Sequence, residues 1–460
     1  MENKLPYDPA NKESVIKYAQ GLVGKSLRQA CDITEENAKN FLGKGNFGQT
    51  LEKYYFLYEP NSESQPDFPG AGLELKSTPL KQLQNKEYRA KERLVLNIID
   101  YMKIVDQNFD TSSFWCKNAN LLLVFYLYQK NLNFMDYVIQ IVDEWDFPEA
   151  DKNVIKQDWE FIKAKVQAGH AHELSEGDTY YLGACPKGKD SNSKRKQPNS
   201  DEMAMQRAFS FKASYVNHII ASIVGNKRIG YGKAIPSLCV KKEQTIEDAI
   251  INKFKKYYGK SASDIQKSLG IELNIGSKSF YSSLCDRIQE FEEIDKAGIL
   301  VKTVILPEGS NPPRENMSFP AFKYEELVSE SWEDSSFKEI LESKFLFVFF
   351  QKIGGDVILR KVKIWNMPYA DIQEAKKVWD KTREVVGSGN IVKSVDELGV
   401  RRTNFPGKTF NKIAHVRPHA TTTKDTYPLP VVDKVTHASE YTKHSFWLNN
   451  RYILEIYRDK

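Results

Sequence analysis

The feature that most constrains the fold of this chain is a set of matches between its first and second halves. The matches occur in the same order in both halves, and each pair is displaced by about 220–237 residues. Ordered self-similarity of this kind is hard to obtain by chance and is the signature of a repeated architecture. The sequence therefore predicts two copies of one domain, with these segments matched: 13–26 with 248–261, 155–166 with 375–386, 180–188 with 414–420, and 207–220 with 444–457.

The repeat also suggests where the domains begin and end. A chain of 460 residues is too long for one ordinary core. We predict a first domain over residues 1–221, a linker over 222–244 and a second domain over 245–460. A capping-box-like run, Thr245-Ile246-Glu247-Asp248, is expected to open the first helix of the second copy. The predicted fold class is α/β (mixed α+β), with two tandem domains of one kind.

Composition excludes several classes of protein. Hydrophobic residues make up 41% and charged residues 28% of the chain, as in globular proteins, and no apolar run approaches the roughly 18 residues of a membrane helix. The polar N-terminus does not resemble a signal peptide, so we expect a cytoplasmic protein. The five cysteines and seven histidines show no zinc-ligand spacing. A net charge of +5 permits a nucleic-acid partner without requiring one.

One short stretch, PDFPGAGLELKST (66–78), places charges where the chain should become buried. Its Pro/Gly segment predicts a turn, and the run after the turn alternates apolar and polar residues at the strand period. Glu74 and Lys76 then share a face, and the turn brings Asp67 alongside Glu74. Two converging carboxylates repel unless a cation neutralises them, and such oxygen ligands suit Mg²⁺. Lys76 beside that ion could orient or deprotonate a water.

A solvated strand face is the plain alternative for this stretch. Charged residues are common in the chain, and three other acidic-x-Lys triplets occur, at 2–4, 342–344 and 374–376. The last two lie in helical patterns, where residues i and i+2 do not share a face. The strand pattern by itself leaves both interpretations open.

The repeat provides a further test of the charged residues. GAGLELKSTPL aligns with KAGILVKTVIL (296–306), and the segments upstream of these also align. The second copy keeps the scaffold and the lysine but loses the carboxylates, which indicates a catalytic first copy and a non-catalytic second one. The matched positions, first copy against second, are Lys76 with Lys302, Glu74 with Leu300 and Glu52 with Cys285.

At this point the residues resemble a known family. PD-x6-ELK is the signature of the PD-(D/E)xK nucleases, and much of the first half resembles the MutH DNA-repair endonucleases. MutH is a single domain, whereas a catalytic half followed by a degenerate half resembles the two-domain type II restriction endonucleases that cut at GATC, the Sau-3A type. The stretches that carry these resemblances are GNFGQTLEKYY (45–55), QPDFPGAGLELKSTPL (65–80), 158–188 and QRAFSFKASY (206–215), and for the two-domain type 91–101, 317–327 and 415–419.

The resemblance implies roles for individual residues. By this resemblance, Asp67 and Glu74 are the metal-binding acids, and the carbonyl of Leu75 is a further ligand. Lys76 is the catalytic lysine, Glu52 is an additional active-site glutamate, and Lys117 is a lysine near the phosphates. The family reads bases from a loop near the end of the domain, here residues 187–207, although a solvated loop is the alternative for any one residue. The candidate DNA contacts in this loop are Lys187, Lys189, Lys194, Arg195, Lys196 and Arg207.

Two other groups of residues complete the prediction. His170 and His172 invite a metal site, but the family does not use them in this way, and we expect structural or DNA-facing histidines. In the second domain, the basic pair Arg401-Arg402 and the HVRPH segment (415–419) occupy the positions where the first half has its base-reading region. The candidate DNA contacts there are Arg401, Arg402, Arg417 and His419.

These residues lead us to expect a Mg²⁺-dependent deoxyribonuclease of a prokaryote, with Mn²⁺ able to substitute. By the resemblance it cuts double-stranded DNA at GATC, leaves 5′-phosphate and 3′-hydroxyl ends, and binds a further GATC site through its second domain as an effector. We expect a monomer in solution; cutting both strands then requires a dimer on DNA or two visits by one chain. A MutH-like methyl-directed mismatch-repair nicking enzyme and a non-catalytic GATC-binding protein are the alternatives.

Overall fold

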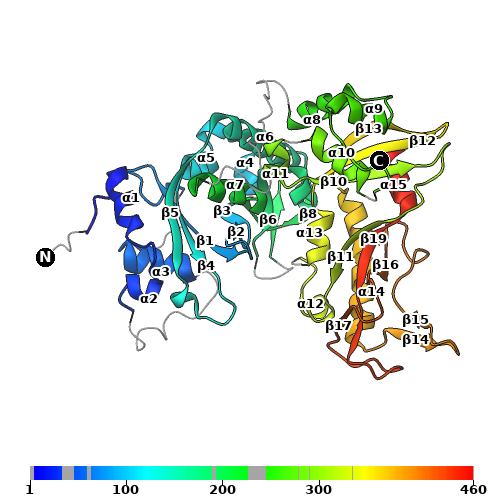
Figure 1. The fold of residues 1–460 in the computed structure, drawn as a ribbon. Coiled ribbons are helices and arrows are strands. Elements are labelled where there is room, and N and C mark those ends of the chain that lie inside the picture. Colours follow the sequence, from blue (N-terminus) through cyan, green and yellow to red (C-terminus); the bar gives the residue numbers. More distant parts are fainter. Residues whose placement is uncertain are drawn as a thin grey trace. The chain divides into compact units, whose positions relative to one another are not determined.

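The chain folds into two compact units, mainly from its first and second halves (Figure 1). Each unit also takes a short segment from the other half, since residues 291–298 belong to unit 1 and residues 175–177 belong to unit 2. Of the predicted linker, residues 226–244 lie outside the described part of the chain. The computed structural model describes residues 5–33, 46–59, 64–188, 193–225, 245–277, 279–289, 291–333 and 335–458.

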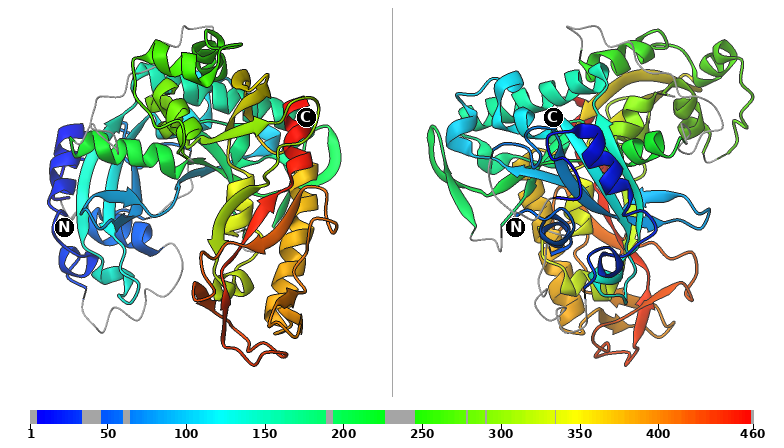
Figure 2. Two further views of the ribbon diagram at one scale, coloured as in Figure 1. Left: turned by 45° about the vertical axis from the view of Figure 1, so that its right-hand side comes forward. Right: turned by 90° about the vertical axis from the view of Figure 1, so that its left-hand side faces the viewer.

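The first sheet of unit 1 contains the charged stretch. Its strands lie in the order β2–β1–β4–β5, and β1 runs parallel to β4 while the other neighbours are antiparallel. One face packs against the N-terminal helices in a continuous apolar core (blue helices in Figure 2). The strands are β1 Glu74–Gln82, β2 Tyr88–Ala90, β4 Asn120–Leu127 and β5 Ile139–Asp146, and the helices are α1 Lys12–Gln20, α2 Leu27–Ala30, α3 Asn46–Thr50 and the π-helix η2 Leu51–Tyr55.

The rest of unit 1 is built around a second, antiparallel sheet in the order β3–β9–β6. The long helix α6 is tied to β6 because the buried carboxylate of Asp158 accepts hydrogen bonds from three successive backbone amides, those of residues 180–182. The elements are β3 Leu94–Ile98, β6 Leu182–Pro186, the hairpin β7 Lys194–Gln197 and β8 Ser200–Met205, β9 Arg207–Phe211, α4 Tyr101–Ile104, α5 Ser113–Asn118, α6 Glu149–Gln167, α7 Ala213–Ile223 and α11 Glu292–Ala297.

Unit 2 has a mixed sheet in the order β10–β12–β13 and an antiparallel sheet in the order β11–β19–β16. Strand β10 is parallel to β12, and β13 is antiparallel to it. Helix α14 packs beside β16 (Figure 1). The strands are β10 Leu300–Leu306, β11 Met317–Phe322, β12 Phe345–Ile353, β13 Asp356–Trp365, β14 Val392–Val395, β15 Arg401–Thr403, β16 Ala414–Pro418, β17 Thr426–Pro428, β18 Glu440–Thr442 and β19 His444–Leu448.

The helices of unit 2 lie before its first strand, between β11 and β12, between β13 and β14, and after β19. Thr245 caps the first of them, because its side chain accepts a hydrogen bond from the amide of Asp248 (3.1 Å), and this confirms the helix start expected from the capping-box-like run. The helices are α8 Ile246–Lys255, α9 Ala262–Leu269, α10 Phe280–Ile288, α12 Tyr324–Ser329, α13 Ser336–Leu341, α14 Tyr369–Gly387 and α15 Asn450–Arg458.

Corresponding elements of the two units make the same hydrogen bond. In unit 1, the hydroxyl of Tyr215 on α7 donates to Asp151 on α6 (3.0 Å). In unit 2, the hydroxyl of Tyr452 on α15 donates to Asp371 on α14 (2.7 Å). In each case a tyrosine of the helix after the antiparallel sheet is fixed to an acid in the first turns of the long helix.

The predicted mixed α/β class is confirmed. In the core, Trp159 of α6 has no exposed surface, and residues 121–125 of β4 are completely buried. No helix in the described part of the chain is long and apolar enough to cross a membrane.

Candidate active site

The charged residues of the stretch 66–78 converge at the start of β1. The backbone amide of Asp67 donates to Glu74 Oε2 (3.1 Å), and Asp67 Oδ2 accepts from the amide of Leu75 (3.0 Å). Lys76 Nζ lies 2.5 Å from Glu74 Oε1. Because only 1% of the Glu74 side chain is exposed, the alternative of a solvated strand face is wrong. The expected approach of Asp67 to Glu74 is observed.

A tight turn anchored in the core holds the two acids together. Phe68 and Leu73 form an antiparallel bridge, with N–H···O distances of 2.9 and 3.2 Å, and both side chains are buried. Between them, Gly72 has a φ of 65°, a left-handed conformation that a residue with a side chain adopts only at a cost. The position of Asp67 is therefore fixed by a turn whose two sides are held by apolar packing.

Lys117 on α5 reaches the same place. Its Nζ lies 3.5 Å from Glu74 Oε2 and donates to the backbone carbonyl of Gln65 (3.0 Å). Ser112 caps the helix that carries Lys117 by accepting a hydrogen bond from the amide of Trp115. Glu74 thus has a lysine on each of its carboxylate oxygens.

Glu52 approaches the site from the π-helix η2, a conformation that is rare and often functional. A Cβ atom added at Gly48 would lie 3.9 Å from Glu52 Oε1 and 3.3 Å from Ser77 Oγ on β1, so the carboxylate lies beside this strand. Burial, and then the charge of Asp67, raises the pKa of Glu52 to about 7. The Glu52 carboxyl group is therefore near another negative group and partly shielded from water.

The site brings together three acids, Asp67, Glu74 and Glu52, and two lysines, Lys76 and Lys117, so the lysines can neutralise at most two of the three carboxylates. Burial raises the pKa of Glu74 despite the opposing charge of Lys76, and the pKa of Glu52 is raised as well. Raised pKa values of neighbouring buried acids mean that their charged forms lack compensation. A small divalent cation with oxygen ligands would supply it, so the donor set fits Mg²⁺.

Tyr58 is a residue of this site that the sequence analysis missed. Leu57 before it has a φ of 61°, and the Tyr58 amide donates to the carbonyl of Glu52 (3.1 Å), which turns the chain back over the site. Its ring packs edge-on against Phe68 (5.6 Å). The Tyr58 hydroxyl is buried, and no residue in the described ranges forms a hydrogen bond with it. Burial, and then the charges of Asp67, Glu52 and Glu74, raises its pKa.

The predicted DNA-reading loop is largely a hairpin in its described part. Its candidate contacts Lys187, Lys194, Arg195 and Lys196 are all exposed, the last three on β7. Lys189 lies outside the described residues. The prediction that Arg207 is a loop residue available to DNA is wrong. It begins β9 in the antiparallel sheet, is 5% exposed, and donates through Nη1 to the carbonyl of Ala184 (2.6 Å).

The candidate contacts of unit 2 are exposed and lie on two strands or just beyond them. Arg401 and Arg402 lie on β15, and Arg417 lies on β16. The Arg417 guanidinium is 5.2 Å from the centre of the Trp447 ring. His419 follows β16 and shares a 3.2 Å hydrogen bond with Ser445. All four residues are exposed to solvent.

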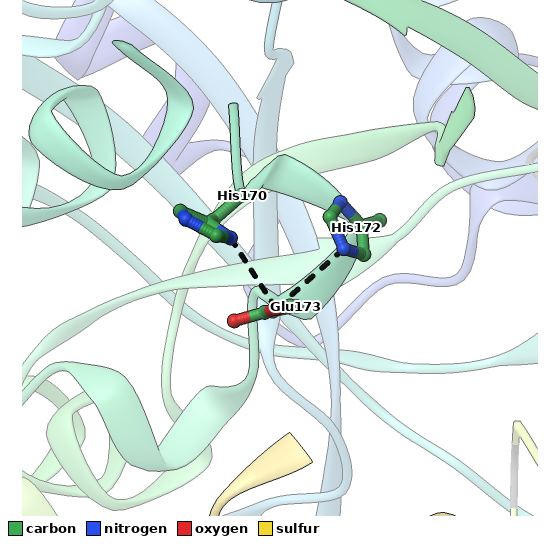
Figure 3. A group of neighbouring side chains, drawn as sticks. All are labelled: His170, His172 and Glu173. Atoms are coloured by element: carbon green, nitrogen blue, oxygen red, sulfur yellow. Dashed lines mark hydrogen bonds and ion pairs between the residues drawn. The ribbon is translucent and has the colours of Figure 1, made fainter. Parts of the chain in front are cut away.

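His170, His172 and Glu173 form a group that could in principle hold a metal ion (Figure 3). Glu173 Oε1 lies 3.3 Å from His170 Nδ1 and 3.6 Å from His172 Nε2. His172 Nε2 also lies 3.3 Å from a carboxylate oxygen of Glu202. Two histidines and two acids therefore meet at one end of the β7–β8 hairpin.

The hydrogen bonds of Gln197 oppose a metal at this group. Its Oε1 accepts from the amide of Ala171 (2.7 Å) and its Nε2 donates to the carbonyl of Glu202 (2.6 Å), so the orientation of the side-chain amide is fixed. The same Nε2 donates to His172 Nδ1 (3.0 Å). The His172 proton then lies on Nε2, facing the carboxylates, and this nitrogen has no free lone pair for a metal. The geometry favours the structural role.

Comparison with known proteins gives two kinds of match. Residues 56–158 match the family described as DNA mismatch repair enzyme MutH. Over 97% of its length the chain is 35% identical to the type II restriction enzyme Sau3AI of Staphylococcus aureus, covering 98% of that protein. It is 26% identical to the DNA mismatch repair protein MutH of Shewanella woodyi, over 48% of this chain and 95% of that protein. It is 23% identical to the DNA mismatch repair protein MutH of Buchnera aphidicola, over 36% of this chain and 74% of that protein.

Proposed function

Because this chain belongs to the family of the type II restriction enzyme Sau3AI, we propose that it is a Mg²⁺-dependent endonuclease that hydrolyses both strands of DNA at GATC sites. The observation that carries the proposal is the convergence of Asp67, Glu74 and Lys76 at the start of β1, within the segment that matches MutH. Products with 5′-phosphate and 3′-hydroxyl ends, and activity with Mn²⁺, complete the proposal.

The residues of the site have distinct tasks in this reaction. Asp67, Glu74 and the carbonyl of Leu75 would hold the cation, which when bound stabilises charge on the phosphate and on the leaving oxygen. Lys76, fixed by its ion pair with Glu74, orients or deprotonates the water that attacks in line. Lys117 compensates charge near the scissile phosphate.

Exposed cations of unit 1 would position the DNA on this site. Lys187 and the β7 residues Lys194, Arg195 and Lys196 can contact phosphates or guanine edges. Their exposure supports this role, whereas the buried Arg207 supports the fold of β9 instead.

We further propose that unit 2 is a second, degenerate MutH-like domain, which binds another GATC site and regulates cutting by unit 1. The parallel–antiparallel strand order of its mixed sheet and the Tyr452–Asp371 hydrogen bond support common ancestry with unit 1. The exposed residues Arg401, Arg402, Arg417 and His419 are its candidate DNA contacts. The chain would be a monomer in solution and pair on DNA for double-strand cutting.

The MutH match favours one other function, a methyl-directed nicking enzyme of mismatch repair. Sequence similarity to the restriction enzyme nevertheless spans both units, whereas similarity to the MutH proteins covers at most 48% of the chain. A nicking enzyme of the MutH type would not account for unit 2, so we consider this function the second candidate. A non-catalytic GATC-binding protein would not need the three converging acids and Lys76.

Plasmids with and without GATC, in defined methylation states, test the proposal. With Mg²⁺ we expect linear products only from GATC-containing DNA, and Glu74→Ala should lose this activity while still binding DNA. Glu374→Ala is a matched control, since Glu374 heads a Glu-x-Lys triplet on the surface of α14. Nicked circles as the end product would favour the repair function, and equal cutting by wild type and Glu74→Ala would refute the assigned site.

A further inference from the structure

Lys302 of unit 2 occupies the place on its strand that Lys76 occupies in unit 1. Each lysine is the third residue of its strand, and that strand runs parallel to a neighbour, β1 to β4 in unit 1 and β10 to β12 in unit 2. Lys76 stands opposite Leu123 of β4, and Lys302 stands opposite Phe347 of β12. The two ladders therefore direct the two lysines to the same face of equivalent sheets.

The surroundings of the two ammonium groups differ. Lys76 is paired with Glu74 at 2.5 Å, but the matching position before Lys302 is Leu300. Cys285, which the sequence aligned with Glu52, is completely buried on α10 and cannot compensate a cation as a thiol. Within the described ranges no carboxylate forms an ion pair with Lys302, and its side chain has no hydrogen bond.

Lys302 is nevertheless partly buried. Its neighbours on the same face of β10 and β12, Val304 and Phe347, belong to the apolar core of unit 2, and burial lowers the pKa of Lys302. Lys363, across the sheet in the same row, donates to the carbonyl of Ile456 (3.3 Å) and so has a partner. A partly desolvated cation without a partner is costly, and an anion supplied from outside the chain would compensate it.

We propose that Lys302 binds a phosphate group of double-stranded DNA and that it does so without a divalent cation. The inference deepens the proposed role of unit 2 and rests on it. In unit 1, carboxylates at this place require a cation before a phosphate can approach. In unit 2, Leu300 and Cys285 remove both the ligands for a cation and the repulsion, so the ammonium group can donate directly to a non-bridging phosphate oxygen.

The test titrates the full chain with short GATC duplexes in Ca²⁺, which supports binding without cutting, and again in excess chelator, to obtain stoichiometry and affinity. Wild type should bind two duplexes per chain in Ca²⁺, and the duplex on unit 2 should remain bound in chelator. Lys302→Gln should weaken one of these two binding events about threefold to tenfold and lower its salt slope by about 0.9, the value for one phosphate contact. Lys302→Arg should restore both the affinity and the salt slope of that binding event. Lys352→Gln, an exposed lysine on β12 of the same sheet, is the matched control.

The outcomes separate the inference from the function on which it rests. One duplex per wild-type chain in Ca²⁺ would overturn the DNA-binding role of unit 2 and the inference with it. Two duplexes per chain with unchanged affinity and slope in Lys302→Gln would overturn the inference alone. No duplex bound to wild type in chelator would refute its cation-independence. Thermal unfolding of Lys302→Gln shows that the variant is folded, and removal of an uncompensated charge should not lower its midpoint.

Discussion

Replacing Glu52 with glutamine should stabilise the metal-free protein while abolishing or strongly reducing cleavage. The pKa of Glu52 is raised from 4.5 to about 7, first by burial and then by Asp67. At about 1.4 kcal/mol per pKa unit, this difference corresponds to about 3 kcal/mol of cost for the charged form. The side chain is partly exposed, so solvent screening reduces the cost to about 1–2 kcal/mol. The melting temperature of Glu52→Gln should then exceed that of wild type by about 5 °C at pH 8.

The sign of the pH dependence follows from linkage. The folded wild type binds more protons than the unfolded chain between pH 4.5 and about 7, so its stability falls as the pH rises through this window and is constant above it. Glutamine does not titrate. The advantage of Glu52→Gln should therefore be near zero at pH 4.5 and full above pH 7.

Thermal unfolding in chelator at pH 4.5, 6 and 8 measures this difference. Glu160→Gln, an exposed position on α6, should show no such trend. Saturating Mg²⁺ should reverse the order at pH 8, because the cation binds the folded wild type and stabilises it by mass action. Equal melting temperatures at pH 8, or the same advantage at pH 4.5 as at pH 8, would show that Glu52 carries no uncompensated charge.

Three further predictions concern the same scaffold. Tyr58→Phe should slow single-turnover cleavage about tenfold and leave DNA affinity unchanged, because only a buried hydroxyl beside the acids is lost; unchanged cleavage would exclude Tyr58 from the reaction. Ca²⁺ should support specific binding in gel shifts without cutting, since it accepts oxygen ligands in looser geometry than Mg²⁺, and cleavage in Ca²⁺ would contradict this. Tyr215→Phe and Tyr452→Phe should each destabilise the protein by about 1–2 kcal/mol in denaturant titrations, because each leaves a carboxylate without its hydroxyl donor.

The centre of the active site could be predicted from the sequence because its geometry is local. The strand period fixes Glu74 and Lys76 on one face, and a Pro/Gly turn returns Asp67 to them, so the ten residues from Asp67 to Lys76 contain the whole arrangement. Thr245 is similarly local, since a cap bonds an amide three residues away.

Other features depended on packing that no short pattern contains. The sequence suggested that Arg207 ends a basic loop. In the structure it pairs with Pro186 of β6, which places it inside a sheet. Tyr58 lies over the site because Leu57 adopts a left-handed conformation, which its residue type does not indicate. Lys117 reaches Glu74 across a separation of 43 positions in the chain, and only the family resemblance pointed to it.

The exchange of segments between the two halves has a consequence for synthesis on the ribosome. Helix α11 completes unit 1 from beyond the predicted linker, and its Lys296 is the buried partner of Asp151 (2.8 Å). A nascent chain that has reached residue 225 has made nearly all of unit 1 but not this cation. At roughly 5–20 residues per second, the ribosome needs several more seconds to supply it. During that interval Asp151 lacks its ion pair with Lys296, and the nuclease unit reaches its final stability only after translation has entered the second half of the message.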